Sequence, residues 1–239
     1  MNLKNKQSLS LRDKKIVVTG GAGFLGKHVV KKLKEHGASN INIPLHQDFD
    51  LTKWEDCQKV CKGADIVIHL AALIGGIGFI NERQGEVFYK NLIMGVQLME
   101  AARVNNVKKY VAIGTVCEYP ERIPRPFKEE NLWDGYPEAI TGAYGMAKKM
   151  AIVQSSAYKV QYDFNAINLL PVNLYGPGDN FDRISAHVIP ALIKKVIAAR
   201  DGGETEVEVW GSGRATREFL YVEDAAEAIV LAVEKYDSS

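Results

Sequence analysis

Tyr144 and Lys148 lie four residues apart in the segment TGAYGMAKKMA (residues 141–151), which reads as part of a helix. Four residues rise about 6 Å along a helix and bring two side chains onto one face. A free tyrosine has a pKa of about 10, and a nearby ammonium group lowers that pKa by favouring the phenolate. The pair therefore predicts an acid–base tyrosine assisted by Lys148, with a solvated helix surface as the alternative.

Three glycines, Gly20, Gly23 and Gly26, lie between the β-branched run KKIVVTG and the helical run GKHVVKKLKEHG. Glycines permit a tight turn and let a dinucleotide pyrophosphate approach the N-terminus of a helix, where free N–H groups favour an anion. A glycine triplet alone is weak evidence, but a strand before it and a helix after it supply the required context. We therefore expect a dinucleotide site here, rather than a purely structural turn.

The remaining coenzyme contacts are expected after the second strand, where the sequence reads NINIPLHQDFDL. The strand end carries neither the acidic residue that holds a 2′-hydroxyl nor the arginine that holds a 2′-phosphate. His46 can meet a phosphate, with a solvated loop histidine as the alternative. Asp50 and Leu51 are expected to border the adenine.

These groups need a scaffold in which strands and helices alternate. Strands are expected at KKIVVTG, NINIPL, ADIVIHLAAL, KKYVAIGTV and DFNAINLLPVNLYGP, with amphipathic helices between them. ADIVIHLAAL is apolar almost throughout, which suits a strand buried on both faces of a parallel sheet. The order predicts an α/β fold with a Rossmann-type doubly wound parallel sheet.

The alternating pattern loosens after about residue 175. There the sequence predicts a helix at ISAHVIPALIKKVIAAR, a short strand at VEVWGSG and a last helix at EDAAEAIVLAVEKY. We divide the chain into an N-terminal tail (1–14), a dinucleotide-binding domain (15–175) and part of a substrate-binding region with returning Rossmann elements (176–239). That last region is expected to be small and incomplete.

The composition argues against several classes of protein. The 239 residues carry a formal net charge of +1, with 46% apolar and 25% charged residues, which argues against a nucleic-acid or membrane-surface partner. No run reaches the roughly 18 to 20 apolar residues of a membrane span, and the N-terminus lacks the apolar core of a secretory signal. Cys57, Cys61 and Cys117 form neither a disulfide framework nor a metal site, so a reducing cytoplasm is expected.

Four motifs together, TGGAGFLG, HLAA, GTVCEYP and YGMAK, resemble the extended short-chain dehydrogenase/reductase family, which comprises nucleotide-sugar epimerases and dehydratases. The resemblance implies that Tyr144 donates or accepts a proton and that Lys148 holds the ribose of the coenzyme. It also implies that Thr115, on the preceding strand, completes the triad, with an ordinary strand threonine as the alternative.

Three further segments, AALIGGI, NLYGPGDNFDRISAHVIPALIKK and VWGSGRATREFLYVEDAA, are similar to the GDP-L-fucose synthases within that family. Such enzymes convert GDP-4-keto-6-deoxy-D-mannose to GDP-L-fucose by C3/C5 epimerisation and NADPH-dependent C4 reduction. The resemblance implies that Cys117 and His187 are the epimerising base and acid, in either assignment. Cys117 lies two residues beyond Thr115, on the same side if the strand stays extended.

The resemblance also implies the residues of the two binding sites. The cofactor set comprises Gly20, Gly23, Phe24, Leu25, Gly26, His46, Asp50, Leu51, Leu70, Ala71, Ala72, Tyr144, Lys148, Pro171, Asn173, Leu174 and His187. The GDP-sugar set comprises Asn173, Lys195, Trp210 and Arg217. NADP(H) is the favoured coenzyme and NAD(H) the alternative. A homodimer is also implied, formed by the helix near residues 86–105 and the Tyr144 helix, with Met150, Val153 and Tyr158 as compatible apolar positions.

Two departures and two rival interpretations stand beside this one. Leu73 follows AA where relatives can carry a polar residue, and Glu118 would raise the pKa of the neighbouring thiol if it pointed inward. One rival is an NAD-dependent 4-epimerase or dehydratase, which needs neither Cys117 nor His187. The other is a non-catalytic dinucleotide-sensing protein, which has no need of the triad.

Overall fold

The computed structural model describes residues 9–182, 186–209 and 211–237. Five parallel strands form the central sheet, in the order β2-β1-β3-β4-β5. They are β1 (Lys15–Thr19), β2 (Asn40–Asn42), β3 (Ile66–His69), β4 (Lys109–Ile113) and β5 (Ala166–Leu169). β2 lies on one side of β1, and β3 lies on the other. The direction of winding therefore reverses between β1 and β3. This confirms the predicted α/β class and doubly wound parallel sheet.

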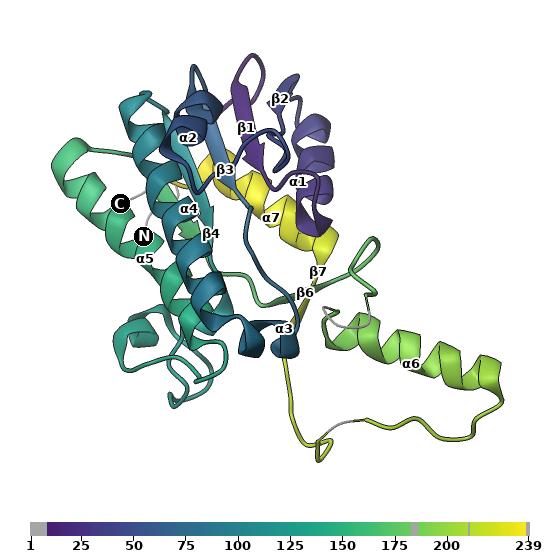
Figure 1. The fold of residues 1–239 in the computed structure, drawn as a ribbon. Coiled ribbons are helices and arrows are strands. Elements are labelled where there is room, and N and C mark those ends of the chain that lie inside the picture. Colours follow the sequence, from purple (N-terminus) through teal and green to yellow (C-terminus); the bar gives the residue numbers. More distant parts are fainter. Residues whose placement is uncertain (1–8, 183–185, 210, 238–239) are drawn as a thin grey trace.

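Helices cover both faces of the sheet (Figure 1). One layer consists of α1 (Phe24–Glu35) and α7 (Val222–Lys235). The other consists of α2 (Trp54–Cys61), α4 (Gln84–Val104) and α5 (Gly142–Tyr162). The amphipathic segments predicted as helices therefore form the two outer layers of the fold.

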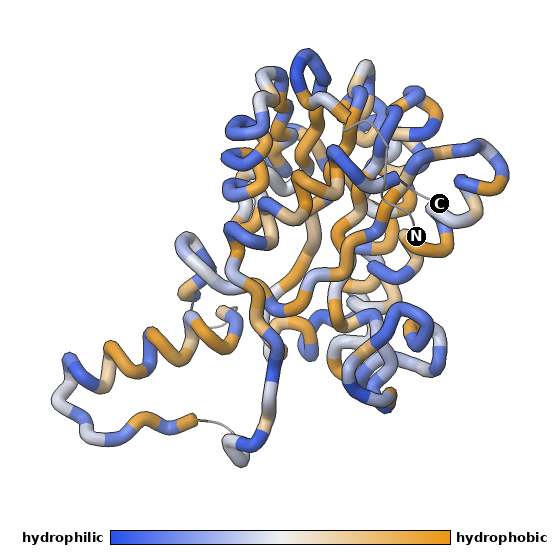
Figure 2. Tube along the Cα trace, turned by 180° about the vertical axis from the view of Figure 1, so that it is seen from behind, coloured by the Kyte–Doolittle hydropathy of each residue, from blue (hydrophilic) through white to orange (hydrophobic). Residues whose placement is uncertain are grey.

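Side chains that alternate between the two faces of the sheet form one hydrophobic core on each face. Ile16 and Val18 of β1 pack with α1 and α7, whereas Val17 packs in the cluster that includes Cys57 and Leu98. Successive side chains of a strand point to opposite faces, so a strand buried on both faces is apolar throughout. In Figure 2 the central strands are coloured mostly as hydrophobic, whereas hydrophobic and hydrophilic residues alternate along the helices around them.

A smaller excursion leaves the sheet after β5. It contains β6 (Asn173–Tyr175), β7 (Phe219–Tyr221) and α6 (Val188–Gly202), which extends away from the helical layers (Figure 1). The run DFNAINLLPVNLYGP was expected to be one strand, but it divides into β5 and β6. Pro171 lies between the two strands and has no N–H for a ladder. β6 pairs in parallel with β7 instead of extending the main sheet.

Two further expectations differ from the structure. Residues 207–209 of the predicted strand VEVWGSG (residues 207–213) are irregular and pair with no strand among the described residues, and Trp210 lies outside the described residues. Within the predicted tail, Leu11 is fully buried against the α1–α7 layer, and the Leu9 N–H donates to the Glu234 carbonyl at 2.8 Å. The described end of that segment is thus part of the fold.

Within the described ranges, none of the helices combines the length and the apolar character that crossing a membrane requires. A short helix, α3 (Ile77–Glu82), which the sequence did not predict, lies between β3 and α4.

Candidate active site

The residues predicted to transfer protons begin where β4 ends. After Ile113 the chain forms a one-turn 3-10 helix, η1 (Val116–Glu118). The Thr115 Oγ1 accepts the Cys117 N–H at 3.2 Å, and the Glu118 Oε1 accepts the Thr115 N–H at 2.8 Å. This reciprocal capping bends the chain into a helical turn. An extended strand was the condition under which Cys117 would share a side with Thr115, and this turn does not meet that condition.

Helix α5 packs directly on this turn. A Cβ placed on Gly145 would lie 2.1 Å from the Cys117 carbonyl oxygen, so only glycine permits so close an approach. Tyr144 precedes this glycine and is only 7% exposed, whereas Lys148 follows one turn later and is partly buried. The structure thus brings Thr115, Cys117, Tyr144 and Lys148 into one region.

Burial controls the ionisation of this region. It raises the pKa of Tyr144 well above its ordinary value, and negative charge on Cys117 and Glu118 adds to the increase. The same burial lowers the pKa of Lys148 to about 8, against an opposing contribution from Glu118. Lys148 was expected to lower the pKa of Tyr144, but in this structure that pKa is raised instead, with burial as the largest cause. Tyr144 consequently keeps its proton at neutral pH, as a proton donor must.

The glycine turn forms the second half of the site. Gly20 adopts a positive φ of 72°, and a Cβ there would lie 2.7 Å from the backbone nitrogen of Ala71. A Cβ on Gly26 would lie 2.1 Å from the Gly20 carbonyl oxygen. α1 then starts at Phe24 without an acidic residue in its first turn. The turn lies between the ends of β1 and β3, where a doubly wound sheet binds its ligand, and it fits the pyrophosphate of a dinucleotide.

Replacing Gly26 tests this cradle. We expect Gly26→Ala to weaken binding of a reduced nicotinamide dinucleotide at least about tenfold, because the turn must open to admit the methyl group. Fluorescence titration measures the binding. Gly85→Ala is the matched control, since nothing lies within 4 Å of a Cβ on this α4 residue. Equal affinities for Gly26→Ala and wild type would contradict the prediction.

Two buried polar side chains that the sequence did not single out support the loop after β3. Asn91 of α4 accepts the Leu73 N–H at 2.9 Å and donates to the Leu73 carbonyl at 2.8 Å. The Thr19 Oγ1 lies 2.8 Å from the His69 Nδ1 inside the sheet. The sequence signal that could have identified these residues is a single polar residue within an otherwise apolar strand or helix pattern. Leu70, Ala71 and Ala72, predicted to contact the cofactor, lie partly buried on this loop.

The residues predicted around the adenine lie after β2. His46 is exposed, and Leu51 is buried in the core cluster with Cys57. Asp50 accepts hydrogen bonds from the backbone and hydroxyl of Thr52, at 3.0 and 2.7 Å, and these bonds lower its pKa. Asp50 therefore stabilises its own turn, and its other oxygen, Oδ2, lies 3.8 Å from the Lys53 ammonium nitrogen.

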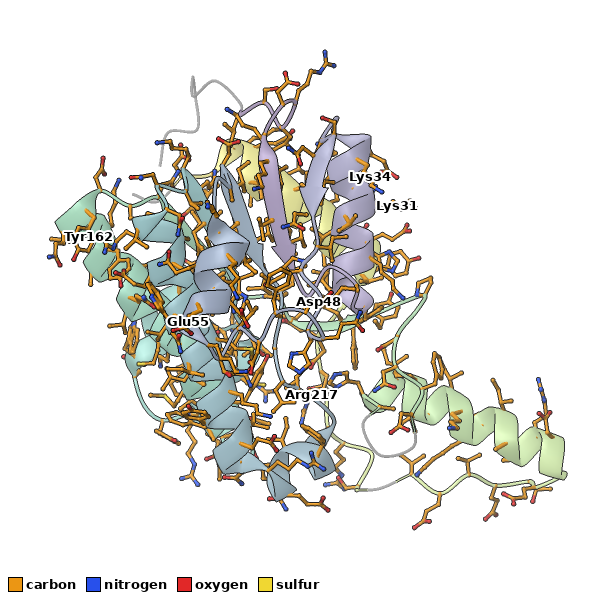
Figure 3. All side chains as sticks on the ribbon, turned by 45° about the horizontal axis from the view of Figure 1, so that its top comes forward. Lys31, Lys34, Asp48, Glu55, Tyr162 and Arg217 are labelled. Carbon is orange, nitrogen blue, oxygen red and sulfur yellow. The ribbon has the colours of Figure 1, made fainter. Side chains whose placement is uncertain are left out.

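The predicted GDP-sugar residues lie on the outer excursion. The Asn173 Nδ2 donates to the Glu218 carbonyl at 3.1 Å, and the Lys195 Nζ donates to the Glu208 carbonyl at 3.1 Å. Arg217 is exposed and, in the view of Figure 3, lies between α4 and α6. Trp210 is outside the described residues. Pro171 and Leu174 are partly buried beside β6.

His187 is not joined to the other catalytic candidates. It is exposed and occupies the N-cap of α6, and no hydrogen bond among the described residues connects it to Tyr144 or Cys117. The two halves of the predicted epimerising pair thus belong to different parts of the fold, η1 and α6.

Glu118 points inward and is fully buried. Burial raises the pKa of its carboxyl group to about 7, while the Thr115 N–H and the ammonium groups of Lys148 and Lys149 oppose the shift. A carboxyl group in the unfolded chain ionises above about pH 4.3, so between that pH and 7 the folded state binds more protons. Folding stability therefore falls as the pH rises through this interval.

We expect Glu118→Gln to remove this loss of stability, which amounts to about 3 kcal/mol by the same linkage. The free energy of unfolding of the variant, taken relative to that of wild type, should therefore be higher at pH 8 than at pH 4.5. Urea unfolding at both pH values measures the difference. Glu121→Gln, an exposed glutamate three residues further along, is the control. The same pH dependence in wild type and Glu118→Gln would refute the burial argument.

Comparison with known proteins places this geometry in context. Residues 16–239 match the model of the NAD dependent epimerase/dehydratase family. GDP-L-fucose synthase 1 of Arabidopsis thaliana is 36% identical over 231 residues, covering 96% of this chain and 72% of the relative. The crystal structure of a GDP-L-fucose synthetase from Naegleria fowleri bound to NADP superposes with a TM-score of 0.85 at 30% identity, covering 98% of this chain and 77% of that one. A GDP-6-OMe-4-keto-L-xylo-heptose reductase from C. jejuni gives a TM-score of 0.87 at 27% identity, covering 96% and 74%.

Proposed function

The chain belongs to the NAD dependent epimerase/dehydratase family, and we propose that it converts GDP-4-keto-6-deoxy-D-mannose to GDP-L-fucose. It is an enzyme that uses NADP(H), like the Naegleria fowleri relative whose structure contains NADP. The observation that carries the proposal is the packing of α5 on η1, which places the Tyr144–Lys148 pair beside Cys117. A simple C4 epimerase has no use for a thiol at this position.

The reaction needs two kinds of proton transfer. At C3 and C5, next to the C4 ketone, a base removes the α-proton and an acid returns a proton to the opposite face. We assign these roles to Cys117 and His187, in either order. The Tyr144 hydroxyl stabilises the enolate oxygen during each inversion by donating a hydrogen bond. Since His187 starts α6, the sugar must lie between η1 and α6.

Reduction at C4 completes the reaction. Bound NADPH supplies the hydride that C4 receives. Tyr144 gives its proton to the C4 oxygen, which becomes the hydroxyl group, and Lys148 then stabilises the phenolate that remains. Thr115 donates a hydrogen bond to the same oxygen. The glycine cradle holds the pyrophosphate of the coenzyme, and the exposed His46 meets its 2′-phosphate.

The cations of the excursion hold the GDP group in this proposal. Arg217 and Lys195 provide the positive charge that neutralises a diphosphate, and Asn173 orients the sugar. Trp210 supplies an apolar wall for the same ligand. All of these side chains except Trp210 lie in the described part of the excursion, and all of those described are exposed.

The test follows NADPH absorbance with GDP-4-keto-6-deoxy-D-mannose and identifies the product by chromatography. The proposal expects NADPH oxidation and GDP-L-fucose. Oxidation that yields only the unepimerised sugar would overturn the epimerase half. Interconversion of a GDP- or dTDP-hexose without net NADPH oxidation would replace the proposal with the 4-epimerase alternative.

We further propose a cytoplasmic homodimer that uses the outer surfaces of α4 and α5. Free Cys57, Cys61 and Cys117 support the reducing compartment. Exposed apolar side chains on these helices, Val153 among them, support the interface. Tyr158 fits it less well, because its ring packs against the protein's own core.

We expect Val153→Glu to convert the dimer to a monomer, because it introduces a charge into an apolar contact. Light scattering after size exclusion gives the mass. Val209→Glu, equally exposed but outside α4 and α5, should stay dimeric. A dimeric Val153→Glu variant would argue against this seam.

A further inference from the structure

Glu118 is the only carboxyl group among the fully buried side chains of the described residues, and it lies beside the proposed catalytic groups. One of its oxygens, Oε1, accepts the Thr115 N–H at 2.8 Å. The same oxygen would lie 2.3 Å from a Cβ on Gly114, so glycine is required there to make room for the carboxylate. Glu118 is therefore built into the turn that presents Thr115 and Cys117.

The second oxygen, Oε2, is buried and has no hydrogen-bond partner among the described residues. Glu118 lines a cavity of ≈ 20 Å³ together with Lys148, His69 and Asn168. Asn168 also has a buried oxygen, Oδ1, without a partner in the described part of the chain. Unpaired buried acceptors are costly, and a cavity of this size holds about one water molecule. The donor suited to these oxygens is the Lys148 ammonium, directly or through one water.

We propose that Glu118 is a positioning residue of the active site, whose carboxylate fixes the turn that carries Thr115 and Cys117 and supplies the negative charge that keeps Lys148 protonated. The inference deepens the proposed function, on which it rests for the role of Lys148. The Lys148 ammonium holds the ribose and stabilises the Tyr144 phenolate. Loss of the Glu118 charge therefore weakens both coenzyme binding and stabilisation of the phenolate.

Each group that faces Glu118 is compatible with this role. From α5, Tyr144 and Lys148 interact with its charge, and so does Lys149, whose ammonium donates to the Leu132 carbonyl. From β3, burial lowers the pKa of His69 to about 3, so that its ring is neutral. Next along the chain from Glu118, burial raises the pKa of Tyr119, with smaller contributions from the charges of Glu129 and Glu118, so that its hydroxyl stays neutral. Cys117 adjoins it on the other side.

The lysines therefore provide the positive charge around Glu118. Lys149 is committed to the loop that contains Trp133, whose ring lies 4.2 Å from the ammonium nitrogen. Among the described residues, the Lys148 ammonium has no hydrogen bond to a side chain or a carbonyl group, and Lys148 lines the cavity that Glu118 also lines. The Glu118 carboxylate therefore acts mainly on Lys148, whose ammonium form its charge stabilises.

The test measures NADPH affinity by fluorescence between pH 6 and 9 without any sugar. In wild type, affinity should fall as Lys148 loses its proton near pH 8. Removing an opposite charge shifts such a titration by about one pH unit, so Glu118→Gln should bind about threefold more weakly than wild type at pH 7.5 and equally at pH 6. Glu118→Asp keeps the charge, so its affinity should fall at the same pH as in wild type, and the exposed control Glu121→Gln should follow wild type throughout.

Distinct outcomes separate the possible explanations. A residue that only shapes the turn predicts that Gln, which has the length of Glu, follows wild type while the shorter Asp deviates. That result, or superimposable pH profiles for Glu118→Gln and wild type, would overturn the proposal. A wild-type profile without an alkaline fall would overturn it too. Because no sugar is present, failure of the proposed GDP-sugar reaction is observed separately, in the NADPH oxidation assay.

Discussion

Tyr144→Phe is expected to reduce NADPH oxidation with the keto-sugar at least about 100-fold, because it removes the proton that the C4 oxygen must receive. Tyr144 is almost fully buried, and burial keeps its hydroxyl protonated at neutral pH. Phenylalanine preserves the ring and its packing, so the loss should appear in kcat rather than in stability or NADPH affinity. Steady-state kinetics with thermal melting and NADPH titration separate these quantities.

The control for this variant lies on the same helix. Tyr162→Phe removes a hydroxyl from the exposed end of α5, where Arg103 lies over the ring at 4.2 Å, and should leave kcat unchanged. A Tyr144→Phe enzyme that retains wild-type kcat would remove Tyr144 from the reaction and assign proton donation to another group.

Cys117→Ser is expected to slow formation of GDP-L-fucose at least about 100-fold, because a serine hydroxyl is a far weaker acid and base at neutral pH. Its effect on hydride transfer should be smaller, since Thr115, Tyr144 and Lys148 remain in place. The variant should therefore accumulate the reduced, unepimerised sugar. Product analysis by chromatography and NADPH absorbance, followed in one reaction, measure both rates.

Cys61→Ser gives the same substitution at a cysteine buried between α2 and α4. It should lower stability without changing the ratio of the two products at a temperature where the protein is folded. If Cys117→Ser forms GDP-L-fucose at the wild-type rate, Cys117 is not part of epimerisation, and the geometry of η1 serves another purpose.

Local patterns were sufficient to predict the central fold. Apolar runs such as residues 66–68 suited strands buried on both faces, and the glycine turn required a strand before it and a helix after it. The strand predicted at residues 207–213 was not found, because a strand depends on a partner and its own sequence does not show whether a partner lies nearby.

The candidate site was predicted unevenly for the same reason. The four-residue spacing of Tyr144 and Lys148 is local and leads directly to one helix face. The turn at Cys117 was missed because the capping of Thr115 by Glu118 outweighed the strand pattern, although the Thr-x-x-Glu spacing was the available signal. Ionisation could not be predicted, because the pKa of Tyr144 depends on burial in the complete fold.

The measurement that tests the central claim most directly is the reaction in D₂O. If the site epimerises before it reduces, each inversion returns a solvent proton, so GDP-L-fucose formed by the wild-type enzyme should carry deuterium at both C3 and C5. NMR spectroscopy of the purified product locates the label. GDP-L-fucose that retains protium at C3 or at C5 would contradict the proposed epimerase–reductase function. A reduced sugar that carries deuterium at neither carbon would contradict it as well.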